Sequence, residues 1–126
     1  MKLQPDQIQT QAVTGYGEGW IAINGEKFDH SLIISSSGHR SQWSFSDPRS
    51  LDEKAFDTLA DMDIELVIYG SGNNLTFPPA EWLSRLTNKG IGVETMDTRA
   101  ACRTYNILAA EGRKVAAALL LPPSSE

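Results

Sequence analysis

Two short segments of this sequence combine residue types that could bind a ligand at the end of a strand. One is Gly70-Ser71-Gly72, and the other begins with Asp97 and Thr98. Glycines let backbone N–H groups approach a ligand, and the N-terminus of a helix attracts anions. Asp97 could bind a ribose or act as a base, although Asp97 or Thr98 is more simply the cap of the helix that follows. Both interpretations, ligand binding and local structure, remain open at this stage.

The glycine segment is not part of a known phosphate-binding motif. The next glycine after Gly72 is Gly90, so the dinucleotide fingerprint is absent, and no Lys-Ser or Lys-Thr follows as in a P-loop. Pro78 and Pro79 also remove two N–H donors that could hold a phosphate. The simpler interpretation is a glycine turn that leads into a helix started by proline.

A second group of candidate residues lies on the helix predicted from Thr98 to Glu111. At 100° per residue, Ala101, Tyr105 and Leu108 face the sheet, with Ala100, Thr104 and Ile107 beside them. The outward stripe then contains Arg99, Arg103 and Asn106, with Cys102 at its margin. Arginine is enriched at interfaces, which predicts a partner-binding surface on this stripe. The alternative is an ordinary solvated helix face.

Cys102 is the only cysteine of the chain and is a candidate nucleophile. A base would have to come from His30 or His39, which lie in the N-terminal half and which the sequence cannot place near the thiol. A structural thiol is the simpler interpretation. The two histidines lack metal-ligand spacing, so the sequence predicts neither a metal site nor a cofactor, and it identifies no catalytic residue.

The elements that position these residues fall into two regimes. The N-terminal half predicts hairpins, with strands at Trp20–Ile23, 31–34 and 42–45 and an Asn24-Gly25 turn that leads into 26–28. Ser50-Leu51-Asp52-Glu53 reads as a capping box, and a stripe of Leu51, Ala55, Leu59 and Met62 predicts a helix behind it.

The C-terminal half alternates strand and helix. Apolar runs predict strands at 65–69, 91–96 and 115–121, with helices between them. Two consecutive right-handed βαβ units would place the three strands in parallel and bring the loops after Tyr69 and Met96 to one edge. The expected fold is therefore α/β (α+β), with a mixed central sheet, helices on one side and an N-terminal β-hairpin layer.

Length and composition limit the classes of function. A chain of 126 residues is expected to form a single domain, with loose tails at 1–10 and 122–126. The net charge of −5 argues against nucleic-acid binding. The apolar run Val115–Leu121 is too short to span a bilayer, and residues 1–7 resemble neither a signal nor a transit peptide. A single thiol and these absences predict a cytoplasmic protein that is not integral to a membrane.

From Glu65 to Leu120 the chain resembles a widespread family of small uncharacterised proteins that includes the mitochondrial complex I (NADH dehydrogenase) assembly factors. The resemblance rests on Gly70-Ser71-Gly72, Phe77-Pro78-Pro79, 90–94, 96–98, 100–106 and Glu111-Gly112-Arg113, and more weakly on Tyr16-Gly17 and 23–25. Relatives commonly have Gly-Thr-Gly where this chain has Gly-Ser-Gly, which keeps the hydroxyl. The resemblance implies a mixed central sheet with helices on one side and a β layer on the other, no established enzymatic activity, and binding to partner proteins.

Two functions follow as expectations. The first is a non-enzymatic protein-binding module that aids assembly of a respiratory complex and binds its subunits or assembly proteins through Arg99, Cys102, Arg103 and Asn106. The second is a protein or enzyme that binds a small anion or another small ligand at the carboxyl edge of the sheet, through Gly70, Ser71, Gly72, Asp97 and Thr98. The sequence does not reveal the partner, the oligomeric state or the reactivity of the thiol.

Overall fold

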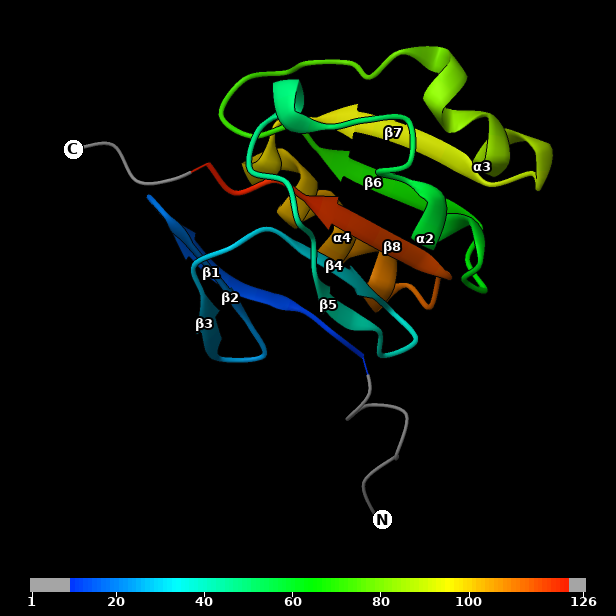
Figure 1. The fold of residues 1–126 in the computed structure, drawn as a ribbon. Helices are drawn as coiled ribbons and strands as arrows, with labels where there is room; N and C mark the ends of the chain where they lie inside the picture. Colours follow the sequence, from blue (N-terminus) through cyan, green and yellow to red (C-terminus); the bar gives the residue numbers. More distant parts are fainter. Residues whose placement is uncertain (1–9, 123–126) are drawn as a thin grey trace.

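The computed structural model describes residues 10–122, and the tails predicted at 1–10 and 122–126 lie almost wholly outside this range. A five-stranded mixed sheet with the order β5-β4-β8-β6-β7 forms its centre, and a separate three-stranded sheet has the order β1-β2-β3 (Figure 1). The strands are β1 Val13–Gly17, β2 Trp20–Ile23, β3 Glu26–Phe28, β4 Leu32–Ser35, β5 Arg40–Gln42, β6 Leu66–Gly70, β7 Gly92–Met96 and β8 Val115–Leu119. The helices are η1 Pro48–Ser50, α2 Asp57–Ala60, η2 Ala80–Leu83, α3 Ser84–Asn88 and α4 Thr98–Ala110.

The two predicted βαβ units are present in the C-terminal half. Strand β6 pairs in parallel with both β7 and β8, and β4 and β5 complete the sheet in antiparallel pairing. Strands β6 and β8 are apolar and almost wholly buried, as expected for strands that are covered on both faces. The predicted fold class, a mixed sheet with helices and a hairpin layer, is confirmed.

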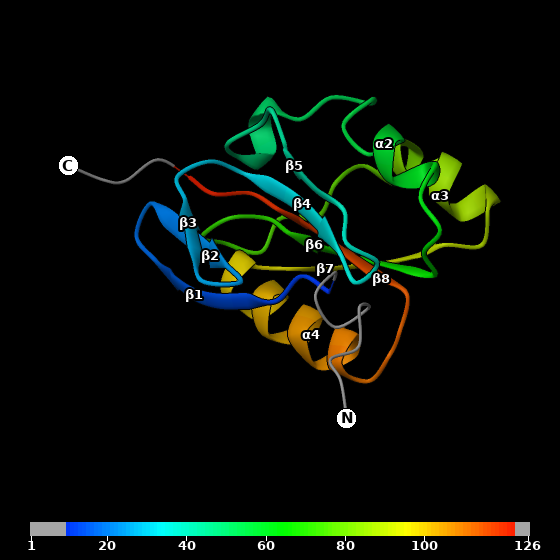
Figure 2. The same ribbon diagram turned by 90° about the horizontal axis from the view of Figure 1, so that it is seen from below.

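The helices are divided between the two faces of the central sheet, in contrast to the expectation that they share one side. Figure 2 shows α4 on the same side as the three-stranded sheet, with α2 and α3 on the opposite side. The strand order explains this division. The chain moves outward from β6 to β7 and then returns past β6 to β8, so two right-handed crossovers place their helices on opposite faces.

The three-stranded sheet closes the α4 side of the core. The predicted Asn24-Gly25 turn joins β2 to β3, and both turn residues have positive φ (50° and 87°), as a two-residue hairpin turn requires. Val13, Ile21 and Ile23 point inward and pack in one cluster with Ala101, Cys102 and Tyr105 of α4, all included in the same buried core. Strand β1 was not predicted from the apolar pattern, because most of its residues are only partly buried.

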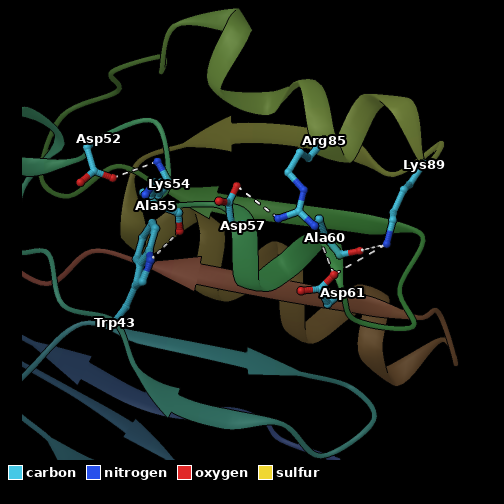
Figure 3. Close-up of polar contacts among 9 residues, drawn as sticks. All are labelled: Trp43, Asp52, Lys54, Ala55, Asp57, Ala60, Asp61, Arg85 and Lys89. Carbon is cyan, nitrogen blue, oxygen red and sulfur yellow. Dashed lines mark hydrogen bonds and ion pairs between the residues drawn. The ribbon is translucent and has the colours of Figure 1, made fainter.

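The other core lies beneath α2 and α3, where one local prediction is wrong. Ser50 does not begin a helix: it ends η1, and Asp47 supplies the capping box. The predicted apolar stripe is nevertheless buried at Leu51, Ala55 and Leu59, because the turns before α2 and the short helix α2 itself pack against the aromatic cluster around Trp43. In Figure 3 the Trp43 Nε1–H donates to the Ala55 carbonyl at 3.0 Å, which fixes these turns to the sheet side.

Candidate functional site

A cavity of about 300 Å³ lies at the carboxyl edge of the central sheet. Its wall comes from four segments that are far apart in the sequence: residues 16–21 of the β1–β2 hairpin, Gly72 and Asn73 after β6, residues 97–99 at the start of α4, and residues 120–122 after β8. The structure therefore brings Gly72, Asp97, Thr98 and Arg99 to one concave surface. Gly70 and Ser71 do not line this cavity.

The Gly70-Ser71-Gly72 segment is held by packing and by its own hydrogen bonds. A Cβ atom at Gly70 would lie 3.0 Å from the Cα of Thr98 and from the Cβ of Ala101, so any other residue here would push the first turn of α4 slightly away from β6. The Ser71 hydroxyl is buried, donates to the Asn74 carbonyl at 2.7 Å and accepts from the Thr76 N–H at 3.0 Å. These contacts give Gly70 and Ser71 structural roles.

Most N–H groups in the first turn of α4 already have partners within the protein, and the Arg99 N–H is the exception among the described residues. The Asp97 carboxylate accepts from the Ala100 N–H at 2.9 Å, which is the capping role expected for it. The Thr98 hydroxyl donates to the Leu120 carbonyl at 2.7 Å and accepts from the Gly72 N–H at 2.9 Å. The Thr98 N–H donates in turn to the Gly72 carbonyl. An anion at this helix end would have to compete with these bonds, so the geometry disfavours an anion site here.

The buried arc of α4 differs from the predicted one. Thr98, Ala101, Cys102 and Tyr105 are the buried residues of the helix, whereas Ile107 is 59% exposed. The margin position predicted for Cys102 is wrong, because this thiol is 1% exposed inside the core. Burial raises its pKa to about 12, against a smaller lowering by Arg103 and a further raising by Asp97. The thiol is therefore protonated and shielded at neutral pH.

Asn106 also differs from its predicted outward position. Its side chain pairs with the backbone of Val13: the Nδ2–H donates to the Val13 carbonyl at 2.8 Å, and Oδ1 accepts from the Val13 N–H at 2.9 Å. The amide thus acts as an extra strand partner for β1 and attaches the three-stranded sheet to α4. The sequence carried no sign of this contact, since 93 positions separate the two residues.

Arg99 and Arg103 are exposed, and both contact Tyr16 of strand β1. The Arg103 Nη1–H donates to the Tyr16 hydroxyl at 3.2 Å, and the Arg99 guanidinium lies 5.3 Å from the centre of the Tyr16 ring. Tyr16 and Trp20 were not candidate residues, although both line the cavity. Trp20–Ile23 was predicted as a strand, but only the weak family match around Tyr16-Gly17 pointed to Tyr16.

The side chains at the cavity are suited to binding. Its wall combines aromatic and aliphatic surface from Tyr16, Trp20 and Leu121 with the charged groups of Glu18, Asp97 and Arg99. The volume is at the lower end of the ~300–1,000 Å³ typical of ligand pockets, which suits one compact group. Asp97 and Thr98 are already engaged in capping and in hydrogen bonds to the backbone.

Fold and site together define a class: a small α+β protein with a mixed central sheet and a recessed surface at the carboxyl edge of its parallel strands. Residues 13–120 match the family model described as a protein of unknown function (DUF498/DUF598). The chain belongs to this family.

Known proteins resemble the chain over most of its length. The human protein named NADH dehydrogenase (ubiquinone) 1 alpha subcomplex assembly factor 3 is 30% identical, and the match covers 96% of this chain and 66% of the human protein. The chain thus spans just under two thirds of that relative. A crystal structure from Bordetella parapertussis is 36% identical with a TM-score of 0.83, covering 89% of this chain and 96% of the other. A solution structure from Bordetella pertussis is 30% identical with a TM-score of 0.82, covering 99% and 95%.

No helix within residues 10–122 is long and apolar enough to cross a bilayer. The predicted cytoplasmic location stays a prediction.

Proposed function

We propose that this protein is a non-enzymatic protein-binding module that aids the assembly of a respiratory complex of the NADH dehydrogenase type. The observation that carries the proposal is the match to proteins named as assembly factors of that enzyme, which extends over 96% of this chain at about 30% identity. Its partners would be subunits of the complex or other assembly proteins, met on the cytoplasmic side of the membrane.

The contacts made by the candidate site residues support protein binding over catalysis. The Ser71 and Thr98 hydroxyls are engaged in hydrogen bonds with the backbone, and the Asp97 carboxylate caps α4. The Cys102 thiol is buried with a raised pKa, so it is a poor nucleophile at neutral pH. Arg99 at the cavity and Arg103 on the next turn of α4 are both exposed, and arginine is typical of interfaces.

Deletion of the coding sequence in the native host tests this proposal. We expect a lower amount of fully assembled NADH dehydrogenase on native gels and lower NADH oxidation by isolated membranes, with both restored by the full chain expressed in trans. An assembly role also predicts that subcomplexes accumulate, which separates it from a general loss of membrane protein. Unchanged amounts of assembled enzyme in the deletion strain would contradict the proposal.

The cavity favours a second candidate function, the binding of a small ligand at the carboxyl edge of the sheet. Its ~300 Å³ volume and mixed lining fit a compact organic molecule better than a simple anion, because most N–H groups at the start of α4 already have partners within the protein. A thermal-shift screen of nucleotides, organic acids and amino acids tests it. A ligand that raises the melting temperature of the native chain, and not of an Asn73→Trp variant with a filled cavity, would support this candidate; a flat screen would contradict it.

A further inference from the structure

We propose that the exposed stripe of α4 and the adjoining cavity form one docking surface for a partner segment that carries carboxylates beside a large apolar side chain. The surface, here called the α4 docking surface, consists of Arg99, Arg103 and Ile107 together with the cavity at the start of the helix. The inference rests on the proposed function, since it specifies the chemistry of the partner.

The two arginines of this surface differ from the other four in the chain. Arg40, Arg49, Arg85 and Arg113 each lie within 4 Å of a carboxylate. Figure 3 shows the most extensive case, in which Arg85 pairs with both Asp57 and Asp61. Within residues 10–122, Arg99 and Arg103 have no such carboxylate and contact Tyr16 instead. Their charges are thus available to a carboxylate from another molecule.

Tyr16 orients this pair of charges. One guanidinium donates to its hydroxyl and the other lies over its ring, so both arginines are held against β1. An arginine that is already positioned loses less conformational freedom on binding than a free one. The residues are four positions apart, so the two charges lie on adjacent turns of one helix face.

Apolar surface lies at both ends of the arginine pair. Ile107 continues the same face by one more turn and is 59% exposed, as are few other large apolar side chains among the described residues. Beyond Arg99, the cavity offers Trp20, Ile21 and Leu121. The stripe from Arg99 to Ile107 is about 12 Å long at 1.5 Å per residue, a length that a short peptide segment can cover.

The charges of the surface specify the occupant. Helix α4 contains two arginines and no acidic residue between Thr98 and Ala110, and the carboxylate that precedes it, Asp97, is used in capping. A partner should therefore place its carboxylates along α4. The cavity beyond Arg99 is lined by Trp20, Ile21 and Leu121, so it favours an apolar side chain inside. A large apolar residue flanked by acidic residues satisfies both conditions.

A peptide titration followed by NMR tests this inference directly. The probe is acetyl-Asp-Asp-Phe-Ala-Asp-Asp-amide, added to the isotope-labelled full chain, with two matched peptides in which Phe is replaced by Ala or each Asp by Lys. We expect the probe to shift the amide signals of Gly72, Arg99, Arg103 and Ile107, and both matched peptides to bind more weakly.

Two variants and one control locate the binding. The double variant R99E/R103E should weaken the probe roughly tenfold, because two attractive charge pairs become repulsive. Asn73→Trp should fill the exposed rim of the cavity and weaken binding of the Phe peptide without affecting the Ala peptide. Arg49→Glu, at a side chain that is 94% exposed and far from α4 in sequence, should bind the probe as the native chain does. Thermal melting checks that each variant is folded, and Arg103→Gln replaces the double variant if that one is not.

Three results would overturn the inference: equal binding of the aspartate and lysine peptides, unchanged binding by the arginine variant, or signal shifts confined to another surface. The complementation assay separates this failure from failure of the proposed function. If deletion lowers the amount of assembled NADH dehydrogenase and R99E/R103E restores it fully, the assembly role stands and the α4 docking surface is wrong. If deletion has no effect, the assembly role fails and the peptide titration still decides the surface.

Discussion

The thiol of Cys102 shows how burial converts a candidate nucleophile into a core residue. Its side chain is 1% exposed and lies in one apolar cluster with Ile21, Ile23 and Tyr105. Removal from water disfavours the thiolate, which raises the pKa to about 12 from an ordinary value of 9.0. Because the thiolate is the reactive form, both access and ionisation oppose chemistry at this atom.

Cys102 is therefore predicted to resist alkylation in the native protein. We expect iodoacetamide at pH 7.5 to leave the folded chain unmodified for hours and to modify it within minutes in urea, measured by intact mass. The matched control is Cys102→Ala combined with Ile107→Cys, which moves the thiol to an exposed position on the same helix and should react readily. Rapid modification of native Cys102 would contradict its placement in the core.

Asn106 illustrates a polar side chain whose role is the attachment of one layer to another. Its amide makes two partly buried hydrogen bonds with the backbone of Val13. Asn106→Ala should lower the free energy of unfolding by about 1–3 kcal/mol, since both bonds are lost and the Val13 groups lose their partner. Urea denaturation measures the change.

A second variant, Asn106→Asp, removes only one of the two hydrogen bonds. A carboxylate can still accept from the Val13 N–H but cannot donate to the Val13 carbonyl, so we expect destabilisation here too. Asn74→Ala, at an exposed position in the loop after β6, serves as the control and should change stability little. Native stability in both Asn106 variants would mean that the Asn106–Val13 hydrogen bonds contribute little to holding β1 against α4.

At the scale of elements, the contact between β6 and the first turn of α4 depends on the absence of a side chain. Gly70 lies at the end of β6, where an added Cβ atom would meet Thr98 and Ala101 at 3.0 Å. The same turn of α4 is linked to the loop after β6 and to the end of β8 through the Thr98 hydroxyl. Three elements thus meet at one tightly packed point beside the cavity.

Gly70→Ala should therefore destabilise the protein by about 1–3 kcal/mol, because α4 must move away from the sheet to accept the methyl group. Gly92→Ala is the matched control in the neighbouring strand β7. A Cβ atom there would meet only the end of the flexible Leu66 side chain, at 3.4 Å. Thermal and urea unfolding should separate the two variants clearly, and equal stabilities would show that the β6–α4 contact is looser than described.

At the scale of the whole molecule, three buried acidic groups link stability to alkaline pH. Burial is the main cause of the raised pKa of Cys102, Tyr69 and Tyr105. For each group the pKa in the folded protein exceeds its ordinary value, which is 9.0 for the thiol and 10.0 for the phenols. The folded state then holds protons that the unfolded state releases as the pH rises.

The free energy of unfolding should consequently be constant with respect to these groups below about pH 9 and fall above it. The thiol contributes first, from about pH 9 towards pH 12, and the phenols join above about pH 10, with at most about 1.4 kcal/mol per pH unit for each group. Urea denaturation between pH 7 and pH 11 measures this slope. Cys102→Ala should flatten the curve between pH 9 and pH 10, and an unchanged curve would contradict the assignment to the thiol.

The sequence alone determined the elements whose signals are local. Trp20–Ile23, the Asn24-Gly25 turn, the parallel strands and the bounds of α4 follow from apolar alternation, turn chemistry and the Asp97 cap, and all agree with the structure. The sequence also predicted that the loops after β6 and β7 lie at the same edge of the sheet, because right-handed βαβ units make the strands parallel.

Only the tertiary structure decided which faces those elements present to one another. Periodicity predicts that α4 is covered by the central sheet alone, whereas the three-stranded sheet also packs against it. This second contact buries Cys102 and engages Asn106, while Ile107 stays exposed. Periodicity reports that a helix has an apolar face, but the direction of that face depends on contacts with residues such as Val13, 93 positions away. The three-stranded sheet brings its own apolar and polar groups to α4. Which residues of the helix stay exposed is therefore decided only when this sheet packs against it.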